Sequence, residues 1–227
     1  MCGRFTLTLS IQEVAEILNV VGEIDWTPKY NIAPGQEVPV VVSDGQNRLE
    51  LFQWGLIPYW AKEQTIGSKM INARAETIDI KPSFKHCLSR QRCLIPASGF
   101  YEWKKEGRSK IPYFFKLNNH KLFCFAGIWD VWKSSEGKII KTCSIITTVA
   151  NELMSPIHNR MPVILEQEKE GIWQKPSLTD PLKLKSLLTP YPAELMNTYQ
   201  VSTYVNSIYN DSSKCIEPFM EQQNSLF

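Results

Sequence analysis

The sequence predicts a single-domain α+β protein with a curved, partly closed, barrel-like antiparallel β-sheet flanked by helices. Three observations lead to this prediction. The chain has 227 residues, 43% of them hydrophobic, which is enough for one sizeable core. Most of its short apolar segments are rich in β-branched or aromatic residues and are bounded by Gly, Pro, Asn or Ser, as strands are. Only two segments show the spacing of amphipathic helices.

The first helical segment covers residues 10–18. Ser10 and Glu13 have the spacing of a capping box, in which each side chain bonds the other residue's backbone N–H. Ile11, Val14 and Leu18 recur on one helical face. We therefore expect a short helix that packs this face on the sheet.

The strands are expected after this helix. Their predicted ranges are 38–42, 49–54, 93–97, 122–128, 143–148 and 162–165, with a last strand at 199–202. Helical spacing returns between residues 166 and 195, where Thr179 or Asp180 is the predicted N-cap and Pro181 the first helical residue. The apolar residues of this second helical segment are Leu182, Leu184, Leu187 and Leu188.

No repeat or linker-like stretch divides the chain, so we expect one domain over residues 1–220 and a flexible tail over 221–227. The net charge of +2 neither supports nor excludes binding to nucleic acid. The sequence contains neither a signal peptide nor an apolar run long enough to span a membrane. We expect a cytoplasmic monomer.

Six cysteines are scattered at irregular spacings without a C-x-x-C pair. This spacing argues against a zinc site, and in a reducing compartment it argues against a disulfide framework. We predict no metal and no cofactor, and expect most cysteines to be buried free thiols.

Cys2 is the residue with the most distinctive chemistry. A small residue after the initiator Met normally allows an aminopeptidase to remove Met1, which would leave a cysteine with a free α-amine beside its thiol. An α-amine with a pKa of about 7.7–8.0 is partly neutral at cytoplasmic pH and can attack an aldehyde. The thiol can then close a thiazolidine ring. The same residue could instead be the nucleophile of a peptidase, and Cys2 alone does not decide between these two chemistries.

Four short motifs follow one another along the chain: MCGRF (1–5), NARAET (72–77), GFYEW (99–103) and HNRMP (158–162). In this order they resemble the SRAP (SOS response-associated peptidase) family, and the resemblance spans essentially the whole chain. It implies a protein that forms a covalent crosslink between its N-terminal cysteine and abasic sites in single-stranded DNA, with possible nicking of the strand and reversal of the crosslink.

The resemblance also implies roles for individual residues. Cys2 would be the nucleophile, and Asn72 would hydrogen-bond near the reacting sugar and the N-terminal amine. Glu102 would be a general acid and base, since a carboxyl group in a partly dry pocket has a raised pKa. His158, one of three histidines, would transfer protons in β-elimination or in reversal of the crosslink. His86 and His120 have polar neighbours and are read as surface residues.

Further residues, inside and outside these motifs, are expected to contact DNA. Arg4, Arg74 and Arg160 would pair with phosphates, and Trp60 and Pro34 would offer apolar platforms for bases. The basic run of Lys104, Lys105, Arg108 and Lys110 is read as a solvated hairpin.

Two alternatives remain open at this level. The first is a cysteine peptidase with Cys2 as nucleophile, His158 as base and Glu102 as orienting group. The second is a non-catalytic module for single-stranded DNA, in which the arginines and Trp60 matter and Cys2 does not.

Overall fold

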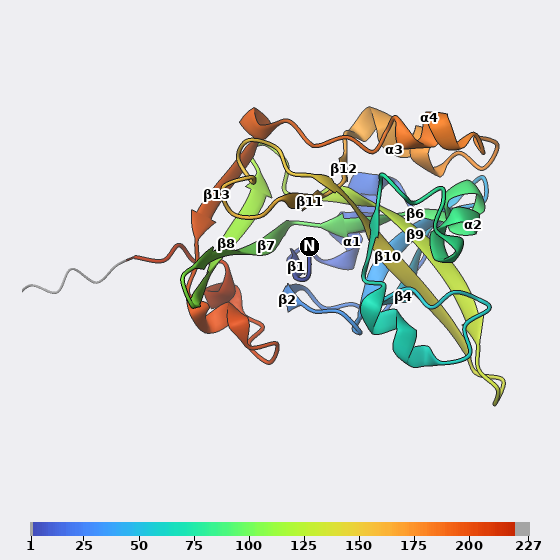
Figure 1. Cartoon of the computed structure of the whole chain (residues 1–227), viewed down its shortest axis with the longest axis horizontal. Helices are drawn as coiled ribbons and strands as arrows, with labels where there is room; N and C mark the ends of the chain where they lie inside the picture. Colours follow the sequence, from blue (N-terminus) through green and yellow to red (C-terminus); the bar gives the residue numbers. More distant parts are fainter. Residues whose placement is uncertain (1, 221–227) are drawn as a thin grey trace, which may run out of the picture.

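The protein is described here by a computed structural model of residues 2–220; Met1 and the tail predicted at 221–227 lie outside the described residues. The described chain forms two β-sheets with helices around them (Figure 1). The α+β prediction is therefore confirmed. The helices are α1 (Ile11–Leu18), α2 (Pro82–Arg90), α3 (Gln167–Gln174) and α4 (Pro181–Lys185), with short 3-10 turns at η1 (Gln64–Lys69), η2 (Ala193–Leu195), η3 (Thr203–Asn206) and η4 (Ser213–Cys215).

The larger sheet is closed into a barrel. Its strands are β3 (Glu37–Ser43), β4 (Asn47–Trp54), β5 (Asn72–Arg74), β6 (Arg92–Ala97), β9 (Phe123–Lys133), β10 (Ile139–Val149), β11 (Arg160–Pro162) and β12 (Ile164–Leu165). Neighbouring strands pair in the order β10-β4-β3-β6-β9, and β9 pairs with β10 again, which closes the ring. Most pairs are antiparallel as predicted, but β10 runs parallel to both β4 and β5.

The smaller sheet carries the beginning of the chain. Its order is β13-β8-β7-β1-β2, from β13 (Met196–Gln200), β8 (Ser109–Leu117), β7 (Gly99–Glu106), β1 (Phe5–Leu7) and β2 (Lys29–Ile32). The chain passes from the barrel into this sheet between β6 and β7, at Ser98 and Gly99. A Cβ on Gly99 would lie 2.1 Å from Phe114 Cζ, so only glycine allows this close crossing.

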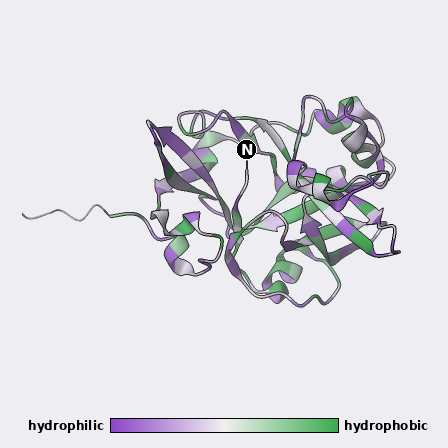
Figure 2. Ribbon diagram, turned by 60° about the horizontal axis from the view of Figure 1, so that its bottom comes forward, coloured by the Kyte–Doolittle hydropathy of each residue, from purple (hydrophilic) through white to green (hydrophobic). Residues whose placement is uncertain are grey.

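Hydrophobic and hydrophilic residues are interspersed along the strands and helices (Figure 2), and the buried hydrophobic residues form one main core cluster. Phe5 of β1 lies at the centre of the core, where its ring meets Trp54 and Phe125 edge-on with centroid distances of 5.1 and 5.7 Å. Such contacts are favourable beyond the area they bury. They draw the first strand, and Cys2 just before it, into the interior.

The first predicted helix is confirmed. Ser10 is the N-cap of α1, both bonds of the capping box with Glu13 are present, and Ile11 and Val14 are buried. Asp180 rather than Thr179 caps α4, and Pro181 begins it. Of the apolar residues named for this segment, Leu184 and Leu188 are buried and Leu182 is exposed, on a helix of only five residues.

The strand predicted at 162–165 is divided in two. Val163 separates β11 from β12, with its N–H bonded to Ile146 of β10 and its carbonyl to Ala126 of β9. The chain thus crosses from one barrel strand to the next at this residue, which a local apolar pattern cannot reveal.

Candidate active site

Cys2 lies in the interior just before β1. Strand β1 is held between β2 and β7, with Phe5 opposite Ile32 and Phe100, so the residues before it are placed firmly. The Cys2 side chain is fully buried. Burial raises the pKa of its thiol, and the negative charge of Glu102 raises that pKa further. The thiol is therefore protonated at neutral pH, and it lies within electrostatic reach of a carboxyl group.

Glu102 is a buried carboxyl group on β7. It is 4% exposed, whereas its neighbours Tyr101 and Trp103 belong to a separate apolar cluster with Val201 and Val205. This alternation is what a strand imposes on successive side chains. Burial raises the pKa of Glu102 to about 7. A carboxyl with this pKa can both donate and accept a proton near neutral pH.

A cavity of about 440 Å³ opens beside Glu102, and Cys2 is not among the residues that line it. Its lining carries an excess of positively charged residues and consists of Arg4, Glu102, Trp103, Lys105, Lys110, His158 and Asn206. Three residues predicted for the site, Arg4, Glu102 and His158, thus face one cavity. A cationic cavity with a buried carboxyl group suits a ligand that carries negative charge.

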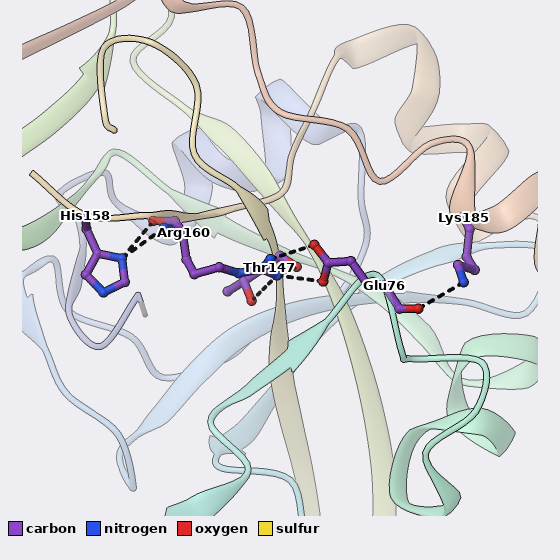
Figure 3. Close-up of polar contacts among 5 residues, drawn as sticks. All are labelled: Glu76, Thr147, His158, Arg160 and Lys185. Atoms are coloured by element: carbon purple, nitrogen blue, oxygen red, sulfur yellow. Dashed lines mark hydrogen bonds and ion pairs between the residues drawn. The ribbon is translucent and has the colours of Figure 1, made fainter. Parts of the chain in front are cut away.

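The His158 imidazole is held by the backbone of Arg160 (Figure 3). The N–H of Arg160 donates to His158 Nδ1 at 3.0 Å, and the Arg160 carbonyl oxygen lies 3.2 Å from the same nitrogen. Because Nδ1 accepts this bond in the neutral ring, the ring proton is assigned to Nε2. Burial lowers the pKa of His158 below its ordinary value, and the nearby charges of Arg160 and Lys105 act in the same direction.

Arg4 joins the first strand to the end of the described chain. Its Nη1 donates to Asn31 Oδ1 at 2.6 Å and to the Val205 carbonyl at 3.0 Å, and its guanidinium lies over the Trp103 ring at 5.7 Å. Asn31 in turn donates to carbonyls of the segment that contains Val205 and Asn206. Arg4 therefore has a structural role in addition to lining the cavity.

Asn72 and Arg74 lie on β5, outside the residues that line the cavity. Asn72 Nδ2 is 3.4 Å from the Ile145 carbonyl of β10, and its buried Oδ1 has no hydrogen-bond partner among the described residues. A buried acceptor of this kind is costly unless a ligand or water satisfies it. Arg74 is exposed.

Arg160 pairs with a carboxylate. Its Nη1 and Nη2 donate to Glu76 Oε1 and Oε2 at 2.6 and 3.0 Å, and Nη2 also donates to the Thr147 carbonyl at 2.7 Å. The predicted phosphate contact is thus already engaged within the protein.

Trp60 and Pro34 lie apart from the cavity. Trp60 is 48% exposed and borders a separate hollow of about 430 Å³ with Lys62 and Lys69. Its loop is anchored, because the N–H of Tyr59 donates to buried Asp130 at 2.9 Å. Pro34 is half-buried in the turn between β2 and β3. Trp60 has the exposure that a base-stacking residue needs.

Sequence reasoning missed several residues of the cavity. Lys105 and Lys110 belong to the predicted hairpin, which forms between β7 and β8, but both line the cavity rather than standing apart from it. Alternation along β7 places Lys105 on the side of Tyr101 and Trp103 rather than of Glu102, so the strand pattern around Glu102 could not have suggested it. Asn206 has no local signal in the sequence, since contacts with residues far away in the chain hold it at the cavity: its Oδ1 accepts from Trp103 Nε1 at 2.8 Å, and its segment is bonded to Arg4 and Asn31.

A larger cavity of about 580 Å³ lies elsewhere, lined among others by Thr6, Ser98, Lys116 and Tyr199. Its hydroxyl groups bond to one another, with Thr6 Oγ1 2.9 Å from Ser98 Oγ. It contains no reactive pair comparable with Cys2 and Glu102, so we place the site at the smaller cavity.

All six cysteines are free and buried, as predicted. Within residues 2–220 no group of three or more His, Cys, Asp or Glu side chains is arranged to hold a metal ion. In the same part of the chain, no helix is both long and apolar enough to cross a membrane.

The fold and the site define a class of protein in which a penultimate cysteine is buried beside a carboxyl group, next to a cationic cavity. The chain belongs to the SOS response associated peptidase (SRAP) family, whose family model matches residues 1–208.

Several relatives support this membership. The abasic site processing protein YoqW of Bacillus subtilis is 50% identical over 222 residues, which cover 96% of this chain and 99% of YoqW. The abasic site processing protein HMCES of Gallus gallus is 33% identical over 225 residues, covering 85% of this chain and 67% of HMCES. A crystal structure of a Bacteroides thetaiotaomicron protein has a TM-score of 0.90 at 30% identity and covers 96% of this chain and 100% of its own.

Proposed function

We propose that this protein senses abasic sites in single-stranded DNA and captures them covalently through Cys2 after removal of Met1. The observation that carries the proposal is the burial of the Cys2 thiol beside the Glu102 carboxyl, next to a cationic cavity. The names of the relatives, abasic site processing proteins, agree with this substrate.

The chemistry follows from the two groups of an N-terminal cysteine. The neutral α-amine attacks the aldehyde carbon of the ring-opened deoxyribose, and loss of one water gives a Schiff base. The thiol then adds across the C=N bond: sulfur bonds to carbon and its proton passes to nitrogen. The product is a thiazolidine, and no oxidant or reductant is consumed.

A protonated thiol suits this order of events. The amine attacks first, so the raised pKa of Cys2 does not slow the first step. Glu102, with a pKa of about 7, would donate a proton to the opening sugar ring and to the departing water, and would later accept one from the thiol.

His158 and Asn72 would complete the reaction. The Nε2–H of a neutral His158 would donate to the sugar oxygen, and the imidazole would move protons in β-elimination or in reversal of the crosslink. The unsatisfied Oδ1 of Asn72 would accept a hydrogen bond from the N-terminal amine or from the sugar.

The DNA strand would be held mainly through its phosphates and bases. Arg4, Lys105 and Lys110 supply positive charge at the cavity, and Arg74 is exposed on β5. Trp60 would stack on a base away from the lesion, and Pro34 would add apolar contact. Arg160 would join them only where a phosphate competes with Glu76.

The peptidase alternative gains less support from the site. A cysteine peptidase needs a thiolate made by a neighbouring base, whereas burial and Glu102 both raise the pKa of Cys2. We expect no turnover of added peptides, and any peptidase activity would be limited to release of Met1.

The test uses Met1-processed protein and single-stranded DNA with one abasic site. A heat-stable shifted band on a denaturing gel is expected with this DNA and not with intact DNA of the same sequence. Mass spectrometry of the starting protein verifies the free N-terminal Cys2. Absence of the band with verified protein would refute covalent capture, and binding without a band would favour the non-catalytic module.

A further inference from the structure

Glu76, in the turn after β5, and Arg160 of β11 form a two-pronged ion pair (Figure 3). The Arg160 side chain is only 12% exposed, and the Glu76 side chain is 46% exposed. Thr147 accepts a further bond from Arg160. The guanidinium is thus held by a carboxylate in the geometry that a phosphate would use.

The Glu76 carboxylate is placed firmly. Its chain neighbour Ala75 is buried and bonds the Thr147 carbonyl through its N–H, and Ile78 is buried two residues later. Lys185 of α4 donates to the Glu76 carbonyl at 3.2 Å (Figure 3). It also donates to Asp79 at 2.9 Å. Arg160 holds the pKa of Glu76 below its ordinary value, and the charge of Arg74 acts in the same direction.

We propose that Glu76 is a specificity-determining residue: its carboxylate occupies Arg160 and lies near Arg74, and so weakens the attraction of intact DNA to this part of the protein. The inference rests on the proposed function, because it assumes a DNA strand near β5 and β11. A phosphate that reaches Arg160 must displace Glu76 and approach its negative charge.

The expected effect of Glu76 is on discrimination between abasic and intact DNA rather than on the total affinity for DNA. Phosphates are common to intact and damaged DNA and carry no information about a lesion. The Glu76 carboxylate partly neutralises the positive charge of Arg160 and so lowers the affinity of the protein for every DNA strand. The covalent step at Cys2 remains available only to an abasic site. A repulsive element against the wrong ligand is a known route to specificity.

The experiment compares Glu76→Gln with the parent protein for binding of intact single-stranded DNA, measured by fluorescence anisotropy over a salt series. Glutamine keeps the size of the side chain and an oxygen acceptor for Arg160. We expect affinity to rise about two- to fivefold, the range of a partly exposed ion pair. The slope of log affinity against log salt should steepen by about 0.7, as for one more neutralised phosphate.

Asp79→Asn is the matched control. It removes one carboxylate from the same turn, but that carboxylate pairs with Lys185 rather than with Arg160. We expect a smaller change in affinity and no change in slope. If affinity rose equally in both variants, the change in net charge alone would explain the effect, and the inference would be wrong.

A double-mutant cycle with Arg160→Ala tests whether Glu76 acts on DNA binding through Arg160. The loss of affinity caused by Arg160→Ala should be small in the parent protein and larger in the Glu76→Gln background. If Glu76→Gln instead lowers affinity as Arg160→Ala does, Glu76 only presents Arg160 to DNA and the inference is wrong. Unchanged affinity with an unchanged slope also overturns it.

Two further measurements keep the result interpretable. Thermal melts establish that the Glu76→Gln and Asp79→Asn variants are folded, and Glu76→Asp provides a second variant that retains the charge and should not gain affinity. Crosslinking of abasic DNA by the parent protein tests the proposed function separately. Capture by the parent with no gain in the Glu76→Gln variant would refute this inference alone.

Discussion

The thiol of Cys2 and the carboxyl group of Glu102 interact in the interior, where the charge of Glu102 raises the pKa of Cys2. Cys2 lies just before β1 and Glu102 lies on β7, the neighbouring strand in the smaller sheet, with Phe5 of β1 opposite Phe100 of β7. Burial also raises the pKa of Glu102 itself. A protonated thiol beside a carboxyl group that exchanges its proton near neutral pH forms a site suited to proton transfer rather than to attack by a preformed thiolate.

Replacing Cys2 should separate the two steps of capture. In Cys2→Ala the processed chain keeps an α-amine but has no thiol, so only a reversible Schiff base can form. We expect no heat-stable band on a denaturing gel with abasic DNA, and a stable band once borohydride reduces the imine. Cys2→Ala treated without borohydride is the control, and a heat-stable band in that lane would show that another nucleophile forms the crosslink.

Glu102 should shape the pH dependence of capture. The amine must be neutral, which favours higher pH, whereas a general acid with a pKa of about 7 is lost as pH rises. The rate of crosslinking should therefore pass through a maximum between about pH 7 and 8. In Glu102→Gln the decline at high pH should disappear and the rate at the maximum should fall about 100-fold or more. If the crosslinking rate of the variant still declined at high pH, the decline would be due to the titration of another group.

His158 should be neutral at pH 7 with its proton on Nε2. Nitrogen-15 NMR of the imidazoles tests this directly, since the chain has only three histidines and His86→Gln and His120→Gln assign the other two. The pKa is expected below its ordinary value because burial disfavours the charged ring. The folded state thus resists protonation, so this residue lowers stability as pH falls below about 6.5. A proton found on Nδ1 at pH 7 would contradict the assignment.

Arg92 should contribute strongly to stability. It is buried on β6 and donates to the Trp173, Leu88 and Lys175 carbonyls at 2.7, 2.8 and 2.7 Å, which ties the ends of α2 and α3 to the barrel. Arg92→Lys cannot reproduce this fork and should lower the free energy of unfolding by about 2 kcal/mol in urea titrations.

The control for Arg92 is Arg48→Lys, which changes an exposed arginine paired with Asp44. Its effect should stay within about 0.5 kcal/mol. Equal losses in the two variants would mean that the buried fork is not the source of the stability.

Local patterns predicted the elements whose formation depends on neighbouring residues. The capping box of Ser10 and Glu13 and the apolar face of α1 lie within a few positions of one another, and the structure has both. Asp180 followed by Pro181 marked the start of α4 in the same way. The short strand β1 was not predicted, because three residues are too few for an alternation to stand out.

The candidate site also has features that the sequence predicts and features that it does not. The position of Cys2 after the initiator Met, and the motifs that contain Glu102 and His158, are properties of the sequence by itself, and they determined both the family and the chemistry proposed. The gathering of Arg4, Glu102 and His158 around one cavity agrees with these motifs. The pairing of Arg160 with Glu76 could not be predicted, although both belong to motif segments.

Only the tertiary structure decided which distant groups meet. Closure of the barrel by β9 and β10, the burial of Cys2 beside Glu102, and the approach of Asn206 to the cavity each join residues far apart in the chain. Local sequence sets backbone preference and the face of each element, because these depend on nearby side chains. The distances, and with them the pKa values and the partners of each charge, depend on how the elements pack around one core.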